Sequence, residues 1–150
     1  MEVRVAGADD MGQLARLLGQ FDEGEQPDGA EPAFATDLLR WWEAHQASHV
    51  AFLAVLPTGT AVGMAWLAIA ARVPRPGGRG RLCGDIQSVY VVAEHRSAGI
   101  GTALIGAVAR QADALGLEHV TVHANQQARS LYERGGFAAS RDLLMRTHGK

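Results

Sequence analysis

The chain has 150 residues, a formal net charge of -2 and an apolar content of 47%. This length and composition predict a single globular domain over residues 1–150. The chain carries no basic surplus of the kind that nucleic-acid-binding proteins show, and its one cysteine, Cys83, excludes an intrachain disulfide.

Targeting and metal-binding signals are missing from the sequence as well. The first residues contain no basic segment followed by an apolar run, and the longest apolar stretch, around residues 63–71, is too short to cross a bilayer. The six histidines are scattered and form no His-Glu-x-x-His pair. We therefore expect a cytoplasmic protein without a bound metal that binds neither membranes nor nucleic acid.

In the first half of the chain, residues 2–6 alternate in a way that predicts a strand. Apolar residues at helical spacing predict helices over residues 11–21 and 36–47, separated by a loop rich in glycine, proline and acidic residues over 22–32. Residues 49–56 and 61–73 predict two strands joined by a tight turn, and hence a β-hairpin.

The second half is expected to alternate strands and helices. In order, its predicted elements are an exposed loop over 74–81, a strand over 86–92, a helix after Gly99 that ends at Gly116, a strand over 119–124, a helix between Ala128 and Gly135, and strands over 137–141 and 143–147. This order predicts an α/β (α+β) fold with a mixed, mostly antiparallel sheet of about seven strands flanked by four helices.

The most informative segment lies between the strand over 86–92 and the following helix. It reads Arg96-Ser97-Ala98-Gly99-Ile100-Gly101-Thr102. Glycines allow a ligand to approach the backbone closely, and the free N–H groups at a helix start attract phosphate. A P-loop is excluded because its lysine is missing, and a dinucleotide fingerprint fails because Leu104 stands where glycine or alanine is required. The remaining alternative is a helix start whose small residues serve only packing.

The Arg-x-x-Gly-x-Gly pattern of this segment resembles the acetyl-CoA motif of the GNAT superfamily of N-acetyltransferases. A downstream segment, residues 125–137, is similar to the second signature of that superfamily at five positions: Asn125, Leu131, Tyr132, Gly136 and Phe137. The predicted element order also matches, so the resemblance covers nearly the whole chain. Two signatures in a fitting context are more specific than either alone.

The resemblance implies a role for each matching position. Backbone groups of Val89, Tyr90 and Val91 would pair with the pantetheine arm of acetyl-CoA, and one N–H, that of Val91, would polarise the thioester carbonyl. Asn125 would bind the pantetheine, and Tyr132 would contact the cofactor and protonate the leaving thiolate, although a core position is the alternative for this tyrosine. The pyrophosphate would lie against the loop made by Arg96, Ser97, Ala98, Gly99, Ile100, Gly101 and Thr102.

The catalytic base is left open by the sequence. Many members of the superfamily have a glutamate at the position that aligns with Gln87, and a glutamine cannot take up a proton. Asp85 shares a strand face with Gln87 unless a bulge intervenes, and His123 lies near the end of the next strand. Either residue is a candidate base, and an ordered water or an already neutral amine would need neither.

The expected function is acetyl-CoA-dependent acetylation of an amine on a small molecule or a peptide. The alternatives are a non-catalytic acyl-CoA-binding regulatory module and a nucleotide-binding regulator. Adjacent Trp41 and Trp42 cannot face the same way on one helix, so one of them is expected to be exposed and available for a homodimer interface. The alternative is that both reach the core from the edges of a broad apolar face. An acidic cluster without Lys or Arg between Leu17 and Leu39 is expected either to steer a cationic acceptor or to be a solvated loop: Asp22, Glu23, Glu25, Asp28, Glu31 and Asp37.

Overall fold

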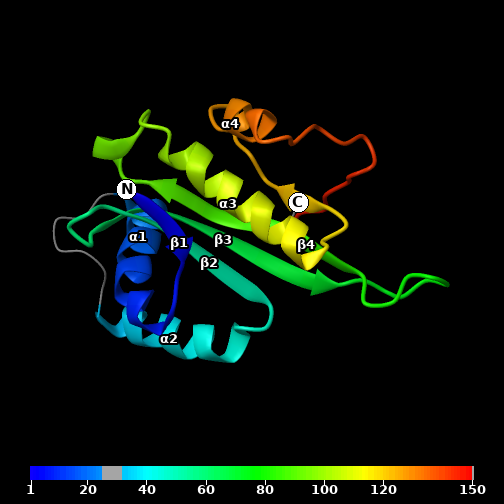
Figure 1. The fold of residues 1–150 in the computed structure, drawn as a ribbon, viewed down its shortest axis with the longest axis horizontal. Coiled ribbons are helices and arrows are strands. Elements are labelled where there is room, and N and C mark those ends of the chain that lie inside the picture. The colour runs from blue at the N-terminus through cyan, green and yellow to red at the C-terminus, as the bar shows by residue number, and fades with distance from the viewer. Residues whose placement is uncertain (25–31, 150) are drawn as a thin grey trace.

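The computed structural model describes residues 1–24 and 32–149, which contain one five-stranded sheet in the order β1-β2-β3-β4-β5. The strands are β1 (Glu2–Val5), β2 (His49–Val55), β3 (Ala61–Ala71), β4 (Leu82–Val91) and β5 (Val120–Val122). The first four strands are antiparallel to their neighbours, whereas β5 is parallel to β4 (Figure 1). A parallel pair needs a crossover, which α3 (Ile100–Leu115) provides.

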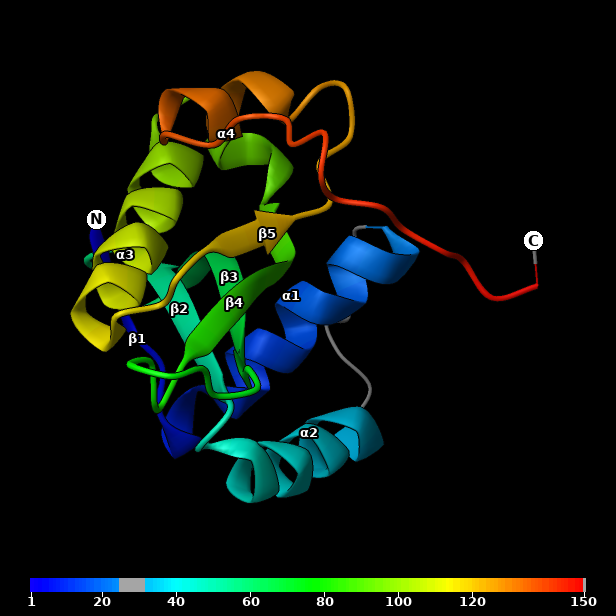
Figure 2. The same ribbon diagram turned by 90° about the vertical axis from the view of Figure 1, so that its right-hand side faces the viewer.

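The helices cover both faces of the sheet. The pair α1 (Met11–Glu23) and α2 (Pro32–His45) lies on one face, and α3 with the short α4 (Arg129–Arg134) lies on the other (Figure 2). Two single-turn 3-10 helices, Ala8–Asp10 and Ala93–His95, precede α1 and α3. The mixed sheet and the four α-helices in the described residues confirm the predicted fold class.

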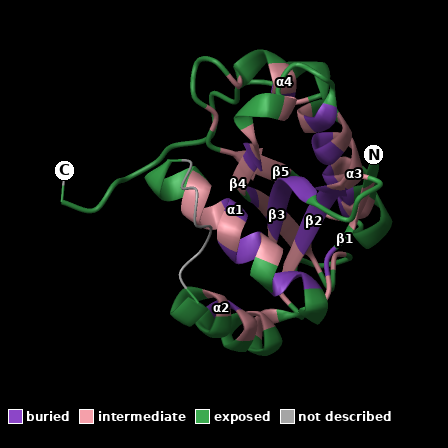
Figure 3. Ribbon diagram, turned by 90° about the vertical axis from the view of Figure 1, so that its left-hand side faces the viewer, coloured by how far each residue is buried: buried purple, intermediate pink, exposed green. Residues whose placement is uncertain are grey.

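Strand β3 contributes to a hydrophobic core on each face of the sheet. Met64 and Trp66 pack with α1 and α2, whereas Val62 and Leu67 pack with α3. Because both faces are covered, residues 61–67 are all buried, which accounts for the uninterrupted apolar run in the sequence. Figure 3 shows the buried residues in the middle of the sheet and on the inner sides of the helices.

The connection from β1 to α1 is fixed by a buried carboxylate. Both terminal nitrogens of Arg4 donate to Asp10 at 2.8 Å, and the Gly7 N–H donates to the same carboxylate at 2.8 Å. Asp10 is only 8% exposed. The arginine and the hydrogen bonds lower the pKa of Asp10, so its negative charge is retained beside the start of α1.

A β-bulge interrupts the pairing between β3 and β4. Trp66 lies opposite Gln87 and Met64 opposite Tyr90, so two residues of β4 face a single residue of β3. Ser88, inside the bulge, has a φ of +56°, which is rare for a residue with a side chain. The bulge bends β4 just before its last residues.

Strand β4 continues well beyond its pairing with β5. The parallel register joins residues 84–86 of β4 to residues 120–122 of β5 and stops there. From Gln87 to Val91, the edge of β4 that faces away from β3 has no partner strand among the described residues. This open edge begins at the bulge and ends near the segment that leads into α3.

The C-terminal segment differs from the sequence prediction. Residues 137–141 and 143–147 form no strands, so the sheet has five strands in the described residues instead of about seven. The segment runs as irregular chain that extends past α1 (Figure 2), and Leu143, Leu144 and Met145 are 61%, 91% and 70% exposed. A strand needs a neighbour for its hydrogen bonds and a core for its apolar side chains. Phe137 packs against the core on the α3 side, but residues 138–147 pair with no strand of the described sheet, and Leu143, Leu144 and Met145 are exposed.

Candidate active site

The loop before α3 presents free backbone N–H groups to solvent. Ser97 and Gly99 adopt positive φ angles of +66° and +83°, and Gly99 caps the helix without a side-chain hydrogen bond. Within the helix, hydrogen bonding starts with the N–H of Ala103, which donates to the Gly99 carbonyl at 3.0 Å. The N–H groups of the preceding turn therefore remain available, and together with the helix dipole they form a site suited to a phosphate group.

Arg96 ties this loop to the end of β4. Its Nε donates to the Val91 carbonyl oxygen at 2.8 Å, and its guanidinium carbon lies 5.5 Å from the centre of the Tyr90 ring. The residue is exposed, so its terminal nitrogens can also reach an anion bound at the loop. Arg96 thus links the loop before α3 to the open strand edge.

The open edge of β4 includes the positions that were expected to bind the pantetheine arm. The N–H of Val92 donates to the Val62 carbonyl at 2.9 Å, toward β3. Because backbone groups alternate in direction along a strand, the N–H and carbonyl of Val91 point to the opposite edge, which agrees with the Arg96 contact. Val91 therefore has a backbone donor that the sheet does not use.

Tyr132 lies in an apolar environment on the α3 side of the sheet. The structure therefore gives it the core position that was the alternative to a catalytic role. It is 6% exposed, and its ring contacts Phe137 edge to face at 5.6 Å between centres. Burial raises the pKa of Tyr132, so the hydroxyl keeps its proton at neutral pH. The side chain also lines an open groove along β5 together with Val122 and Ala124.

One of the two polar atoms of the Asn125 side chain forms a hydrogen bond within the protein. Its side-chain oxygen accepts a hydrogen bond of 2.8 Å from the N–H of Ala128, the residue that caps α4. Asn125 therefore stabilises the start of α4, and its amide nitrogen remains for a ligand.

The two candidate bases have different surroundings. Asp85 accepts hydrogen bonds from Thr121 at 2.6 Å and from Gln87 at 3.3 Å, so the bulge does not separate Asp85 from Gln87. His123 follows β5 and is exposed. Alternation along β5 places His123 on the same face as Thr121, and therefore on the face that carries Asp85.

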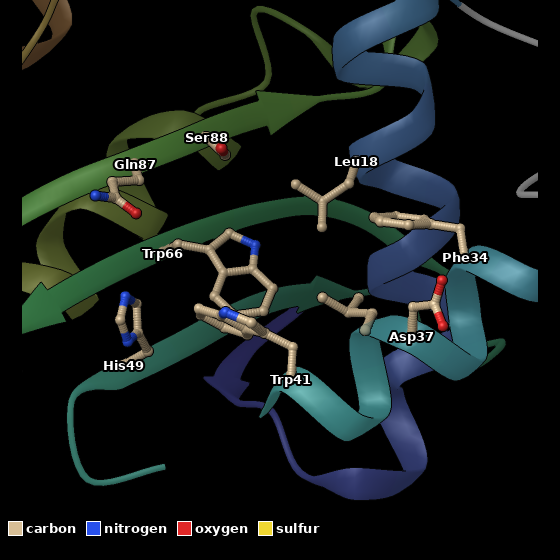
Figure 4. A pocket seen from close by; sticks show the side chains of 9 residues that line it. Leu18, Phe34, Asp37, Trp41, His49, Trp66, Gln87 and Ser88 are labelled. Carbon is tan, nitrogen blue, oxygen red and sulfur yellow. The ribbon is translucent and has the colours of Figure 1, made fainter. Parts of the chain in front are cut away.

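A pocket of about 490 Å³ lies on the α1 and α2 side of the sheet, next to the bulge. Figure 4 shows Phe34 and Asp37 on α2, Trp41 and Trp66 in the middle, His49 on β2 and Ser88 above them. In the described part of the chain, the pocket is lined by Leu18, Phe34, Asp37, Leu38, Trp41, His49, Trp66, Gln87 and Ser88.

Aromatic packing shapes this pocket. Trp41 stacks on His45 at 4.3 Å and meets Trp66 edge to face at 6.1 Å between ring centres. Burial and the neighbouring His45 lower the pKa of His49, which is therefore neutral at pH 7. The indole nitrogen of Trp66 is buried without a hydrogen-bond partner in the described residues, which costs free energy unless a bound molecule or water satisfies it.

Phe34, His49 and Trp66 were not predicted as site residues from the sequence. The helical spacing of adjacent Trp41 and Trp42 predicted only that the two side chains face different ways. Trp41 is 38% exposed and lines the pocket, whereas Trp42 packs against the core. The aromatic residues between positions 34 and 66 are visible in the sequence. They indicate a pocket only in the folded structure, where the sheet brings them together.

The acidic cluster falls partly outside the described residues. Glu25, Asp28 and Glu31 belong to the stretch that the structure does not describe, whereas Asp22 and Glu23 are exposed near the end of α1. Asp37 lines the pocket. One carboxylate of the cluster therefore contributes directly to the cavity.

Two general features can be stated for residues 1–24 and 32–149. No group of three histidine, cysteine, aspartate or glutamate side chains is placed to hold a metal ion. No helix in the same ranges has the length and hydrophobicity required to cross a membrane.

Comparison with known proteins agrees with the geometry. A model of the acetyltransferase (GNAT) family matches residues 13–137. The chain belongs to the GNAT acetyltransferase family. A relative, the glucosamine 6-phosphate N-acetyltransferase of Trypanosoma brucei brucei, is 32% identical over 139 residues, which cover 93% of this chain and 90% of the relative.

Solved structures show the same fold. An acetyltransferase from Trypanosoma brucei superimposes with a TM-score of 0.76 at 27% identity, covering 97% of this chain and 98% of the other. An acetyltransferase from Clostridium acetobutylicum, solved with acetyl-CoA, gives a TM-score of 0.72 at 19% identity, covering 97% and 95%. These structures share the fold, whereas the family model and the 32% identical relative identify the chain as an N-acetyltransferase, whose reaction requires an amine as acceptor.

In this GNAT acetyltransferase the two sequence signatures pack against each other. A side chain on Gly101 would place its Cβ 3.3 Å from Leu131, and one on Gly135 would place its Cβ 3.1 Å from Ile105. These glycines let α4 approach α3 closely. Gly101 therefore has a packing role at the start of α3, whereas Gly99, with open space around it, is required for its positive φ.

Proposed function

We propose that this chain transfers an acetyl group from acetyl-CoA, bound along the open edge of β4, to an amine in the aromatic pocket beside the bulge. One observation carries this proposal. Ser88 lines the pocket, while the edge from Val89 to Val91 continues toward the loop over residues 96–102. Donor and acceptor would thus approach the same short stretch of β4 from two sides.

The donor would be held mainly by backbone groups. The N–H groups of residues 97–102 would bind the pyrophosphate, with help from Arg96. The outward backbone groups of Val89 and Val91 would pair with the pantetheine arm, with Tyr90 between them, and the amide nitrogen of Asn125 would contribute from the opposite side. These groups supply orientation, which is a large part of catalysis in a transfer between two bound molecules.

The N–H of Val91 would polarise the carbonyl of the bound thioester. When the amine attacks the carbonyl carbon, a C–N bond forms, the C–S bond breaks and negative charge develops on the oxygen. A fixed backbone donor stabilises that charge without reorganisation. Tyr132, whose pKa is raised by burial, would then donate its proton to the departing thiolate.

The amine must lose a proton for the transfer to finish. Asp85 or His123 would take it, directly or through a water molecule, because both lie on the sheet face that carries the pocket. Asp85 has the more defined position, since Thr121 and Gln87 orient its carboxylate. Gln87 itself would position the acceptor and would not titrate.

A change at Val91 tests the proposed donor of the carbonyl hydrogen bond. Val91→Pro removes the outward N–H, whereas the matched variant Val91→Ala keeps it and shortens the side chain. We expect Val91→Pro to lower kcat about 100-fold, the usual cost of losing one such donor, with CoA affinity by calorimetry changed much less. Wild-type kcat in Val91→Pro would contradict the assignment.

Thiol release from acetyl-CoA across a panel of amines tests the reaction itself. If the folded protein binds CoA tightly but none of the amines causes it to release thiol from acetyl-CoA, the protein acts as an acyl-CoA-binding module and the proposed catalysis is wrong.

A further inference from the structure

The lining of the aromatic pocket indicates what kind of molecule it holds. The rings of Phe34, Trp41 and Trp66 stand around the cavity, and Leu18 and Leu38 add further apolar surface. Phe34 and Trp41 are each 38% exposed, an unusual exposure for large apolar side chains that point into the same cavity. A flat apolar group placed among these rings would remove both from water.

The residues that line the pocket also include a negatively charged side chain and no positively charged one among the described residues. Asp37 supplies a carboxylate, while His49 and Gln87 are neutral at pH 7. Among the described residues, no lysine or arginine lines the pocket, and the sequence from Leu17 to Leu39 contains neither residue. Arg40 follows on α2 but is not among the lining residues.

A phosphate group would therefore find no counter-charge in this pocket. Phosphate recognition in proteins depends on arginine, lysine or a free helix N-terminus, and the N-terminus suited to phosphate here belongs to the donor loop before α3. An ammonium group meets the opposite situation, because Asp37 and the faces of the aromatic rings attract cations.

We infer that the acceptor is an amine joined to a flat aromatic group, and that a sugar phosphate is not a substrate of this enzyme. The inference rests on the proposed function, because it assumes that the pocket beside Ser88 is the acceptor site. The ring lies between Trp41, Trp66 and Phe34, and the amine reaches the bulge at Ser88. The trypanosomal relative, by contrast, is named for an amino sugar that carries a phosphate.

Steady-state kinetics with four amines tests the inference. The probes are 2-phenylethylamine and tryptamine, which carry rings, ethylamine, which lacks one, and glucosamine 6-phosphate. We expect kcat/KM for the ring-bearing amines to exceed that of ethylamine and of the sugar phosphate by about tenfold or more. A higher kcat/KM for glucosamine 6-phosphate would overturn the inference and leave the proposed function standing.

Two variants connect the preference to the pocket. Trp41→Ala should reduce kcat/KM for 2-phenylethylamine about tenfold more than it reduces kcat/KM for ethylamine, which separates loss of the ring site from general damage. Asp37→Asn should raise KM for the ring-bearing amines, whereas Glu43→Gln, an exposed change on the same helix, should not. Equal losses for both amines in Trp41→Ala would contradict a ring-binding role.

Binding provides a separate readout. Calorimetry of 2-phenylethylamine added to the protein saturated with CoA should show binding that Trp41→Ala weakens. If no amine is acetylated but this binding is present, the pocket assignment holds and the proposed catalysis fails. If 2-phenylethylamine does not bind, the inference is wrong regardless of the catalytic result.

Discussion

Thr121 on β5 lies directly opposite Asp85 on β4, and its hydroxyl donates a 2.6 Å hydrogen bond to the aspartate carboxylate. This pair lies one position before Ile86 and Val122, the last registered pair before the two strands separate. The hydrogen bond orients the carboxylate toward the same sheet face as Gln87, whose amide contributes a second bond.

Replacement of Asp85 tests its role as base. Asp85→Asn removes the charge and preserves the shape, and we expect kcat to fall about 100-fold with little change in CoA affinity. Thr121→Val keeps the Asp85 carboxylate but removes the hydrogen bond that orients it. We expect kcat to fall by less than in Asp85→Asn. If Asp85→Asn retains the wild-type rate, His123→Gln becomes the decisive variant, and a rate loss there assigns the base to His123.

The tyrosine on α4 can be tested by removal of a single oxygen. Tyr132→Phe keeps the ring contact with Phe137 and eliminates the proposed acid, so kcat should fall about 100-fold or more under conditions where chemistry limits the rate. The melting temperature should stay close to that of the wild type, because the ring remains. An unchanged kcat would show that Tyr132 serves only the core.

Glycine at the start of α3 should be required for its backbone angle. Gly99→Ala places a side chain at a φ of +83°, at a cost of about 1–2 kcal/mol unless the loop shifts. Calorimetry should therefore show weaker CoA binding. Gly106→Ala, within the same helix, is the matched control: its Cβ meets only the end of the Arg110 side chain, so stability should rise slightly and CoA affinity should not change.

The contact between Arg4 and Asp10 predicts a pH-dependent contribution to stability. Folding lowers the pKa of Asp10, so the contribution is complete above the unfolded-chain pKa of about 3.9 and is lost as the pH falls through the lower folded-state pKa. Asp10→Asn should lower the free energy of unfolding by about 2 kcal/mol at pH 7, and chemical denaturation should show this difference shrinking below about pH 4.

Glu2 offers a control for the same arginine. Its carboxylate lies 3.9 Å from Arg4 and is largely exposed, so Glu2→Gln should not measurably change stability. Equal destabilisation by the two variants would mean that the overall negative charge near Arg4 matters and the buried geometry does not.

The sequence predicted those elements that depend on local patterns. Apolar spacing and the glycines at 99, 116 and 135 located α3 and α4, the two helices that follow the loop over residues 96–102, because helix periodicity and helix ends are local properties. The two signatures predicted that the loop and α4 both bind acetyl-CoA, and this role stays a prediction. The structure shows that the two segments are neighbours, because Gly101 lies close to Leu131.

Features that depend on distant contacts were not predicted. The bulge at Ser88 arises from the register between β3 and β4, and nothing in the residues around Ser88 indicates it. The two strands expected after Phe137 required a neighbouring strand that the sequence cannot guarantee. The aromatic pocket combines α1, α2, β2, β3 and β4, so its members gained meaning only through the fold.

The sheet separates two hydrophobic cores, and the proposed donor and acceptor sites rest on different ones. The donor loop is built on α3, which packs on one face, whereas the aromatic pocket is built on α1 and α2 on the other. Replacements on α2 can therefore reshape the acceptor cavity without disturbing the packing of α3. Mutations on one side of the sheet can therefore change the acceptor during evolution, while selection preserves the binding of the same acyl donor on the other side.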